Sequence, residues 1–171
     1  MDIKPLHLVP EFYHILAQWA YEEWYRSRSL EFDLVLHAFL ARTKNDSLPQ
    51  SFVAVENSLP VGMVTLKLDD LWARKDINPW LSSLYVHPGY RKHGIGLALV
   101  RSVISRALDI GFHDLYLFLS QTQMDRLKEY YTKRGWEVIG DAPDNDGLQT
   151  HILKFNLEQA GSNMASGISF P

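Results

Sequence analysis

The stretch LYVHPGYRKHGIGLAL, residues 84–99, is the most informative part of the sequence. Its first residues have the apolar character of a strand, and His87-Pro88-Gly89 stops that strand. A turn with two glycines, Gly94 and Gly96, then leads into a segment whose apolar residues recur at helical spacing. The stretch therefore predicts a strand, a glycine-containing turn and a helix in direct succession.

This turn is suited to an anion. The first turn of a helix leaves several backbone N–H groups without intrahelical partners, and the helix dipole favours negative charge there. Gly94 and Gly96 have no Cβ that would keep a bulky phosphate away from the backbone. Arg91 and Lys92 add positive charge. We predict a phosphate-binding turn; the alternative is a tight strand-to-helix connection whose charges are incidental.

Two common phosphate-binding motifs do not fit the turn. A P-loop would continue with Gly-Lys followed by Ser or Thr, and the chain does not. The dinucleotide fingerprint needs a third glycine at a fixed distance after Gly94 and Gly96, and none stands there. Neither kind of site is therefore predicted.

Composition and charge indicate an ordinary globular protein. The chain has 171 residues, of which 46% are hydrophobic and 22% charged, and its net charge is −3 with a pI near 6.1. This charge gives no overall attraction to nucleic acid or to an anionic membrane, so we expect neither as a partner. The absence of cysteine excludes disulfides, thiolate metal sites and cysteine nucleophiles.

The length predicts one domain, over residues 1–157, followed by a flexible tail over residues 158–171 that is rich in Gly, Ser and Asn. The first residues lack the apolar run of a signal peptide, and no stretch is apolar for long enough to span a bilayer. Together with the missing cysteines, these features predict a cytoplasmic protein.

Periodicity predicts an α+β fold. Strands are expected at residues 3–8, 51–56, 61–68, 80–86, 114–119, 136–139 and 148–155, and helices at residues 10–25, after Ser29 as N-cap, at 94–110 and at 123–134. The second and third strands should pair antiparallel across a short turn, and residues 80–119 should form a right-handed parallel crossover. The strand at residues 114–119 is apolar on both faces, so it should lie centrally.

Two details complete the predicted fold. The second helix should bury a stripe made of Leu34, Val35, Ala38 and Phe39. Residues 141–147 contain Asp, Asn, Pro and Gly, which indicates a loop between the last two strands.

The turn resembles motif A of the GNAT superfamily of N-acetyltransferases, Arg/Gln-x-x-Gly-x-Gly/Ala between the fourth strand and the third helix. Residues 91–96 match that motif, and Val86-His87-Pro88 is similar to the Val-x-Pro that precedes it. Val61-Gly62 opens the third strand much as in the family, and residues 131–136 are similar to its Tyr-x-x-x-Gly-Phe. The order of elements agrees over residues 3–155. The resemblance implies a mixed, mostly antiparallel sheet with a central parallel crossover and helices on both faces.

The resemblance implies acetyl-CoA as cosubstrate and no metal. The pantetheine amides would pair with backbone groups of residues 84–86, and the diphosphate would lie on N–H groups of residues 93–97 with Arg91 and Lys92 nearby. The cofactor-binding residues so implied are Leu84, Tyr85, Val86, Arg91, Lys92, His93, Gly94, Ile95, Gly96, Leu97, Ala98 and Ser120.

One part of the family pattern is different in this chain. Many members carry an Asn that touches the pantetheine seven residues before the tyrosine, where this chain has Met124, and Leu127 replaces the usual small residue. Ser120, Gln121 and Gln123 are the candidates to take over that contact.

The reaction implied by the resemblance is direct attack of a primary amine on the thioester in a ternary complex. In the family the tyrosine that corresponds to Tyr131 protonates the departing thiolate. A backbone N–H of the fourth strand would stabilise the oxyanion.

The amine needs a base, because an alkyl amine has a pKa of about 10 and only about one molecule in a thousand is neutral at pH 7. The carboxylates available are Glu22, Glu23, Asp69, Asp70 and Asp76, of which Asp76 and Glu23 are favoured. Trp19, Tyr21, Trp24 and Tyr25 are either an amine-binding surface or part of the core.

The predicted function is N-acetylation of a primary amine, with a small molecule as the expected acceptor. Two alternatives stay open: a protein or peptide N-acetyltransferase, and a non-catalytic module that binds an acyl-CoA. Because members of the family often dimerise, a homodimer is a further possibility.

Overall fold

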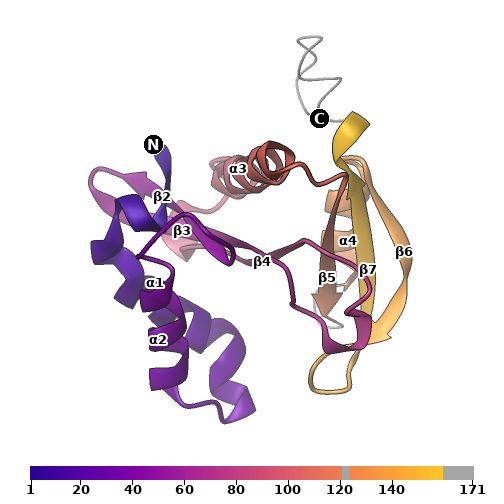
Figure 1. Cartoon of the computed structure of the whole chain (residues 1–171), viewed down its shortest axis with the longest axis horizontal. Helices are drawn as coiled ribbons and strands as arrows, with labels where there is room; N and C mark the ends of the chain where they lie inside the picture. Colours follow the sequence, from indigo (N-terminus) through magenta and orange to yellow (C-terminus); the bar gives the residue numbers. More distant parts are fainter. Residues whose placement is uncertain (121–123, 160–171) are drawn as a thin grey trace. The chain divides into compact units, whose positions relative to one another are not determined.

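The computed structural model describes residues 1–120 and 124–159 (Figure 1). The backbone forms two compact units. The first unit comprises residues 1–66 and 82–103, and the second comprises residues 67–81 and the chain from residue 104 onward. The predictions for Gln121, Gln123 and residues 160–171 lie outside the described part of the chain.

Four α-helices and seven strands make up most of the structure. The helices are α1 (Tyr13–Ala20), α2 (Phe32–Ala41), α3 (Ile95–Ile110) and α4 (Met124–Thr132). The strands are β1 (Asp2–Pro5), β2 (Gln50–Glu56), β3 (Leu59–Lys67), β4 (Trp80–Val86), β5 (Asp114–Ser120), β6 (Trp136–Pro143) and β7 (Gln149–Asn156). A π-helical segment, η3 (Tyr21–Tyr25), follows α1 directly.

The strands form one sheet in the order β1-β2-β3-β4-β5-β7-β6. The pairs β1–β2, β2–β3, β5–β7 and β6–β7 are antiparallel, whereas β4 and β5 are parallel, with Trp80 opposite Tyr116. The predicted mostly antiparallel sheet with one parallel crossover is therefore confirmed. The first two residues of β4 belong to the second unit, and its other residues belong to the first unit.

The hairpin between β2 and β3 shows how the sequence produces this pairing. Asn57 and Ser58 have φ angles of 50° and 63°, the left-handed conformation that a two-residue hairpin turn needs. Asn tolerates this conformation better than most residues because its short side chain can hydrogen-bond to the local backbone. β3 therefore begins at Leu59, two residues earlier than predicted.

In the first unit, helices cover both faces of the sheet. Met63 and Val53 pack in one hydrophobic cluster with Leu16 and Phe39, which come from α1 and α2. The neighbouring Gly62 faces the other side of β3, toward α3, because successive residues of a strand point to opposite faces. Burial on both faces explains why β3 is buried from residue 61 to 66 rather than in alternation.

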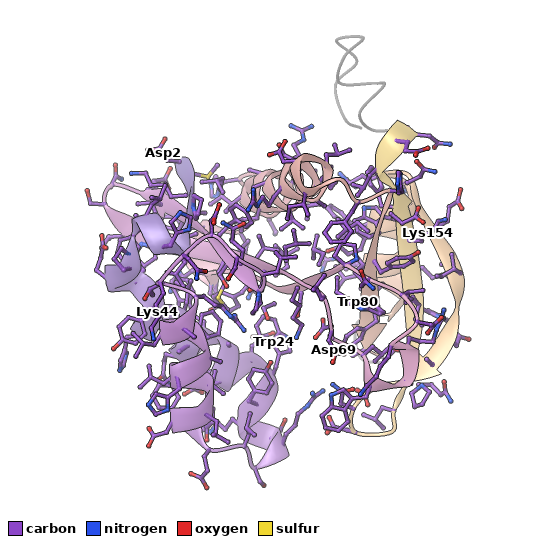
Figure 2. All side chains as sticks on the ribbon, in the orientation of Figure 1. Asp2, Trp24, Lys44, Asp69, Trp80 and Lys154 are labelled. Atoms are coloured by element: carbon purple, nitrogen blue, oxygen red, sulfur yellow. The ribbon has the colours of Figure 1, made fainter. Side chains whose placement is uncertain are left out.

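In the second unit, a separate cluster packs against the sheet. Trp80, labelled in Figure 2, is among the largest fully buried side chains and contacts the rings of Tyr116 and Phe118. Leu71, Ala142 and Ile152 belong to the same cluster. As predicted, β5 is central, between β4 and β7.

Several local predictions were wrong. β1 ends at Pro5 rather than residue 8, and residues 6–8 form a 3-10 turn that buries Leu6. β6 extends to Pro143 and takes in the first part of the predicted loop. That strand then ends in a tight turn, where Oδ1 of Asp144 accepts hydrogen bonds of 2.9 Å from the backbone N–H groups of residues 146 and 148.

The second helix also differs from its prediction. Ser29 has a left-handed φ of 53° and ends the preceding 3-10 turn, so it is not the N-cap of α2 as predicted; the N-cap is Glu31, and α2 begins at Phe32. Of the predicted stripe, Val35 and Phe39 are buried, whereas Leu34 and Ala38 are exposed. The apolar face of α2 is therefore narrower than the sequence indicated. Among the helices of residues 1–120 and 124–159, none is long and apolar enough to cross a membrane.

Candidate functional site

The site begins with a close approach between β3, β4 and α3 in the first unit. A Cβ on Gly62 would lie 2.8 Å from the backbone oxygen of Tyr85 and 3.1 Å from Cδ1 of Leu99. No side chain other than hydrogen fits there without displacing backbone, so a glycine is required for packing. The sequence showed Gly62 as part of a pattern, and the structure supplies its physical reason.

β4 contains a strained residue that sequence reasoning missed. Ser83 has a φ of 53° inside the strand. A left-handed conformation costs a non-glycine residue on the order of 1–3 kcal/mol and persists only where the surroundings impose it. Serine gives no sequence signal for this conformation, so Ser83 could not have been found by pattern. It lies directly before residues 84–86, the predicted pantetheine-binding segment.

After β4 the chain makes a tight turn, η6 (Pro88–Tyr90), held by local hydrogen bonds. The backbone N–H of Tyr90 donates to the oxygen of His87 at 2.8 Å, and the Nδ1 atom of His87 accepts from the N–H of Gly89 at 3.3 Å. The backbone is then left-handed at Lys92 (φ 68°) and Gly94 (φ 78°). The Gly94 oxygen accepts the first helical bond of α3, from Ala98 at 3.1 Å.

The two glycines of this turn face open space. A Cβ on Gly94 would meet nothing within 4 Å, and one on Gly96 would only touch Cγ2 of Val86 at 3.8 Å. Gly94 is explained in part by its positive φ, but Gly96 lies in the first turn of α3, where glycine is less favourable than alanine by about 1 kcal/mol. The packing of the protein therefore gives no reason for Gly96.

The charged side chains of the turn differ in their contacts. Nε of Arg91 donates to the backbone oxygen of Val86 at 2.9 Å, and its guanidinium carbon lies 5.9 Å from the centre of the Tyr85 ring. Nδ1 of His93 lies 3.3 Å from the oxygen of Tyr90. Arg91, Lys92 and His93 are all exposed.

An aromatic contact joins α1 to the end of β4. The Trp19 ring lies 5.1 Å from the Tyr85 ring and 6.2 Å from that of His87. Burial raises the pKa of the Tyr85 phenol, the positive charge of Arg91 opposes this shift, and the negative charge of Glu23 adds to it. Glu23 is exposed on the π-helical η3, so a predicted base and the predicted pantetheine segment are close enough to interact electrostatically.

Tyr131 belongs to the second unit and is buried, with 5% of its surface exposed. Its ring meets that of Trp136 edge-on at 5.5 Å and that of Tyr130 at 5.3 Å. Burial raises the pKa of the Tyr131 phenol well above its ordinary value, and the neighbouring Tyr130 adds to the shift. The phenol therefore stays protonated at neutral pH.

Asp76 and Ser120 also lie in the second unit. Both carboxylate oxygens of Asp76 accept hydrogen bonds of 2.8 Å from Arg74, and this pairing lowers the pKa of the Asp76 carboxyl. Ser120 ends β5 opposite Thr150 of β7. A carboxylate with a lowered pKa is a weaker base, so the ion pair argues for Glu23 over Asp76.

The predicted site residues thus fall into two groups. Residues 84–86, 91–98 and Glu23 come together in the first unit, while Tyr131, Asp76 and Ser120 are positioned by the second. Within residues 1–120 and 124–159, no cluster of three or more His, Asp or Glu side chains could hold a metal ion. The roles of all these residues remain predictions.

Comparison with known proteins shows the family to which the sequence is similar. The family model described as "Acetyltransferase (GNAT) family" matches residues 9–136. Among curated proteins, no sequence matches the chain.

Several solved structures share the fold. The structure named aminoglycoside 6'-acetyltransferase type Ii has a TM-score of 0.70 at 18% identity, covering 92% of this chain and 97% of that one. An aminoglycoside 6'-N-acetyltransferase complexed with coenzyme A has a TM-score of 0.69 at 18% identity, with the same coverage. An acetyltransferase from Streptococcus agalactiae has a TM-score of 0.67 at 18% identity, covering 91% and 97%.

Proposed function

Since this chain belongs to the acetyltransferase (GNAT) family, whose members are acyltransferases that use acetyl-CoA, we propose that it acetylates the primary amine of a small molecule. The amine attacks the thioester directly, in a complex that holds both substrates. The observation that carries the proposal is the open glycine turn before α3, because Gly96 has no packing role and leaves its backbone accessible. A CoA diphosphate is a ligand that would use this accessibility.

The binding of acetyl-CoA would draw on both the turn and β4. Backbone N–H groups of residues 93–97 hold the diphosphate, supported by the exposed charge of Lys92. Residues 84–86 pair with the pantetheine amides in the manner of an added strand. Ile95 and Ala98 contribute backbone at the start of α3, and Ser120 is a candidate to take over the pantetheine contact of the family asparagine.

The chemical step needs a base, an oxyanion donor and an acid. Glu23 takes a proton from the ammonium group, and the free amine then attacks the carbonyl carbon. A backbone N–H of β4 stabilises the oxyanion. As the intermediate collapses, the C–S bond breaks and the thiolate receives a proton from Tyr131. The nitrogen loses its second proton to solvent, and Tyr131 regains one from solvent, leaving an N-acetyl amine and free CoA.

The names of similar structures favour a small-molecule acceptor over a protein. Two of the similar structures bear the names of aminoglycoside acetyltransferases, and aminoglycosides are small polyamines. The surface beside Tyr85 combines the ring of Trp19 with the nearby negative charge of Glu23, and both features attract the ammonium group of an amine of either class.

The test is a thiol-release assay with acetyl-CoA and a panel of acceptors. Small amines, among them aminoglycosides and polyamines, and short peptides with free N-termini or lysines are compared, while calorimetry measures acetyl-CoA binding separately. We expect acetyl-CoA to bind and small amines to accelerate thiol release. If only peptides stimulate thiol release, the acceptor is a peptide or protein and not a small molecule. If acetyl-CoA binds but no amine stimulates thiol release, the protein is a non-catalytic binding module.

A further inference from the structure

The side chains on either side of Lys92 both turn back to the protein backbone. Arg91 donates from Nε to the oxygen of Val86, the last residue of β4, at 2.9 Å. His93 approaches the oxygen of Tyr90 at 3.3 Å through Nδ1. Lys92 between them is exposed and has the left-handed φ of 68°.

This arrangement has an energetic reason. A lysine in a left-handed conformation is strained, and such strain persists only when the surrounding structure imposes it. The bond from Arg91 to Val86 ties the residue before Lys92 to the end of a strand that packs against Gly62 and α3. The Tyr85 ring, within cation–π range of the guanidinium and in contact with Trp19, holds the same side chain from a second direction.

We propose that Arg91 is a positioning residue: it fixes the turn through Val86 and Tyr85, while Lys92 and the backbone N–H groups bind the diphosphate. This inference rests on the proposed function, because it states which residues of the turn bind acetyl-CoA and which one positions them. It replaces the expectation that the charge of Arg91 acts directly on the phosphates.

The two roles of Arg91 can be separated by substitution, because donor and charge can be removed independently. In Gln the side-chain N–H group stands the same number of bonds from the backbone as Nε in Arg, so Arg91→Gln keeps the donor and loses the charge. Arg91→Lys keeps the charge but has no N–H at that position. Arg91→Met has neither.

The experiment measures the Kd for acetyl-CoA of the full chain and of these variants by calorimetry, at low and high salt. Positioning predicts that Arg91→Gln stays within about threefold of wild type, whereas Arg91→Lys and Arg91→Met both lose about tenfold, the size of one charge-assisted hydrogen bond. The loss in Arg91→Lys, which keeps the charge, should be equal at both salt concentrations, because a positioning defect is not screened. KM for acetyl-CoA should rise while kcat changes little, and thermal unfolding checks that each variant is folded.

Lys92→Gln is the matched control, because it changes the neighbouring residue and its loss of affinity is expected to depend on salt. Its loss of affinity should be large at low salt and shrink at high salt, because it removes an exposed charge near an anion. If Arg91→Lys binds like wild type and Arg91→Gln does not, Arg91 is a phosphate ligand and the inference is overturned. If the wild-type chain itself has no affinity for acetyl-CoA, the proposed function fails first, and the inference falls with it.

Discussion

The turn at residues 91–96 and the segment around Tyr131 carry equally recognisable motifs, but the fold accounts for them very differently. Tyr131 is buried between Trp136 and Tyr130, so core packing alone would preserve an aromatic residue there. A Cβ added at Gly96 would meet nothing closer than 3.8 Å, and the glycine weakens the helix it begins. A residue that the fold does not need is stronger evidence of function than one that it does.

The carboxylates show the same contrast. Asp76 accepts two hydrogen bonds from Arg74, so its carboxylate already has a partner within the protein. Glu23 lies exposed on a π-helical segment, where its charge acts on Tyr85 of β4. Short π-helical segments are frequent at functional sites, because they cost stability that is otherwise selected against.

The largest effect is expected from filling the open space at Gly96. Gly96→Leu should weaken acetyl-CoA binding by at least about 100-fold, or roughly 3 kcal/mol, because the new side chain occupies the diphosphate position. The free energy of unfolding should stay the same or rise by up to about 1 kcal/mol, since leucine favours a helix. Calorimetric titration and thermal unfolding of the same preparation measure both quantities.

Ser105→Leu is the control for this substitution. Ser105 is exposed in the same helix, away from the turn, so the added leucine should leave acetyl-CoA affinity unchanged. If Gly96→Leu binds acetyl-CoA with wild-type affinity, the open space at Gly96 is not a ligand site. The contrast between Gly96 and Tyr131 would then have no basis.

The second prediction compares substitutions of the carboxylates of Glu23 and Asp76. Glu23→Gln should lower kcat about 100-fold, the lower end of what general acid–base catalysis contributes, without changing the Kd for acetyl-CoA. Asp76→Asn should stay within about twofold, because it removes an exposed ion pair of small energy. Steady-state kinetics at saturating amine measure both variants, and the reverse ranking would assign the base to Asp76.

The sequence predicted those features of the structure that depend on neighbouring residues, and missed those that depend on distant ones. β4 was placed at its observed bounds, because the apolar run and His87-Pro88-Gly89 are local features. The narrow face of α2 was missed, since burial of Leu34 depends on which elements pack against the helix. Ser83 was missed for another reason: its left-handed backbone is imposed by the surrounding structure and has no sequence signal.

The candidate site follows the same rule. The motif residues of the turn were recognised because their spacing is short and fixed. The contacts that distinguish Arg91 from Lys92, and Glu23 from Asp76, are made by residues elsewhere in the chain or by the backbone, such as Val86 and Arg74. Residue type could therefore nominate the candidates but could not rank them.

Among the residues proposed to act in the chemical step, the smaller effect is expected at Tyr131. Tyr131→Phe should lower kcat about tenfold, less than a well-matched acid would, because a phenol with a pKa of at least about 10 is a poor proton donor to a thiolate of pKa about 8.5. The Kd for acetyl-CoA should not change, and stability at neutral pH should be preserved, because the ring that packs on Trp136 remains. Unchanged turnover would leave Tyr131 with its packing role alone.

Alkaline unfolding provides an independent check on that variant. Burial raises the pKa of Tyr131 in the folded state, whereas an unfolded tyrosine titrates near pH 10. Above about pH 10 the unfolded chain releases a proton that the folded chain retains, so stability must fall with rising pH, by up to about 1.4 kcal/mol per pH unit. Tyr131→Phe lacks this loss, while the other tyrosines contribute equally to both proteins. The variant should therefore resist alkali better than wild type, and equal sensitivity would show that the phenol is not buried in solution.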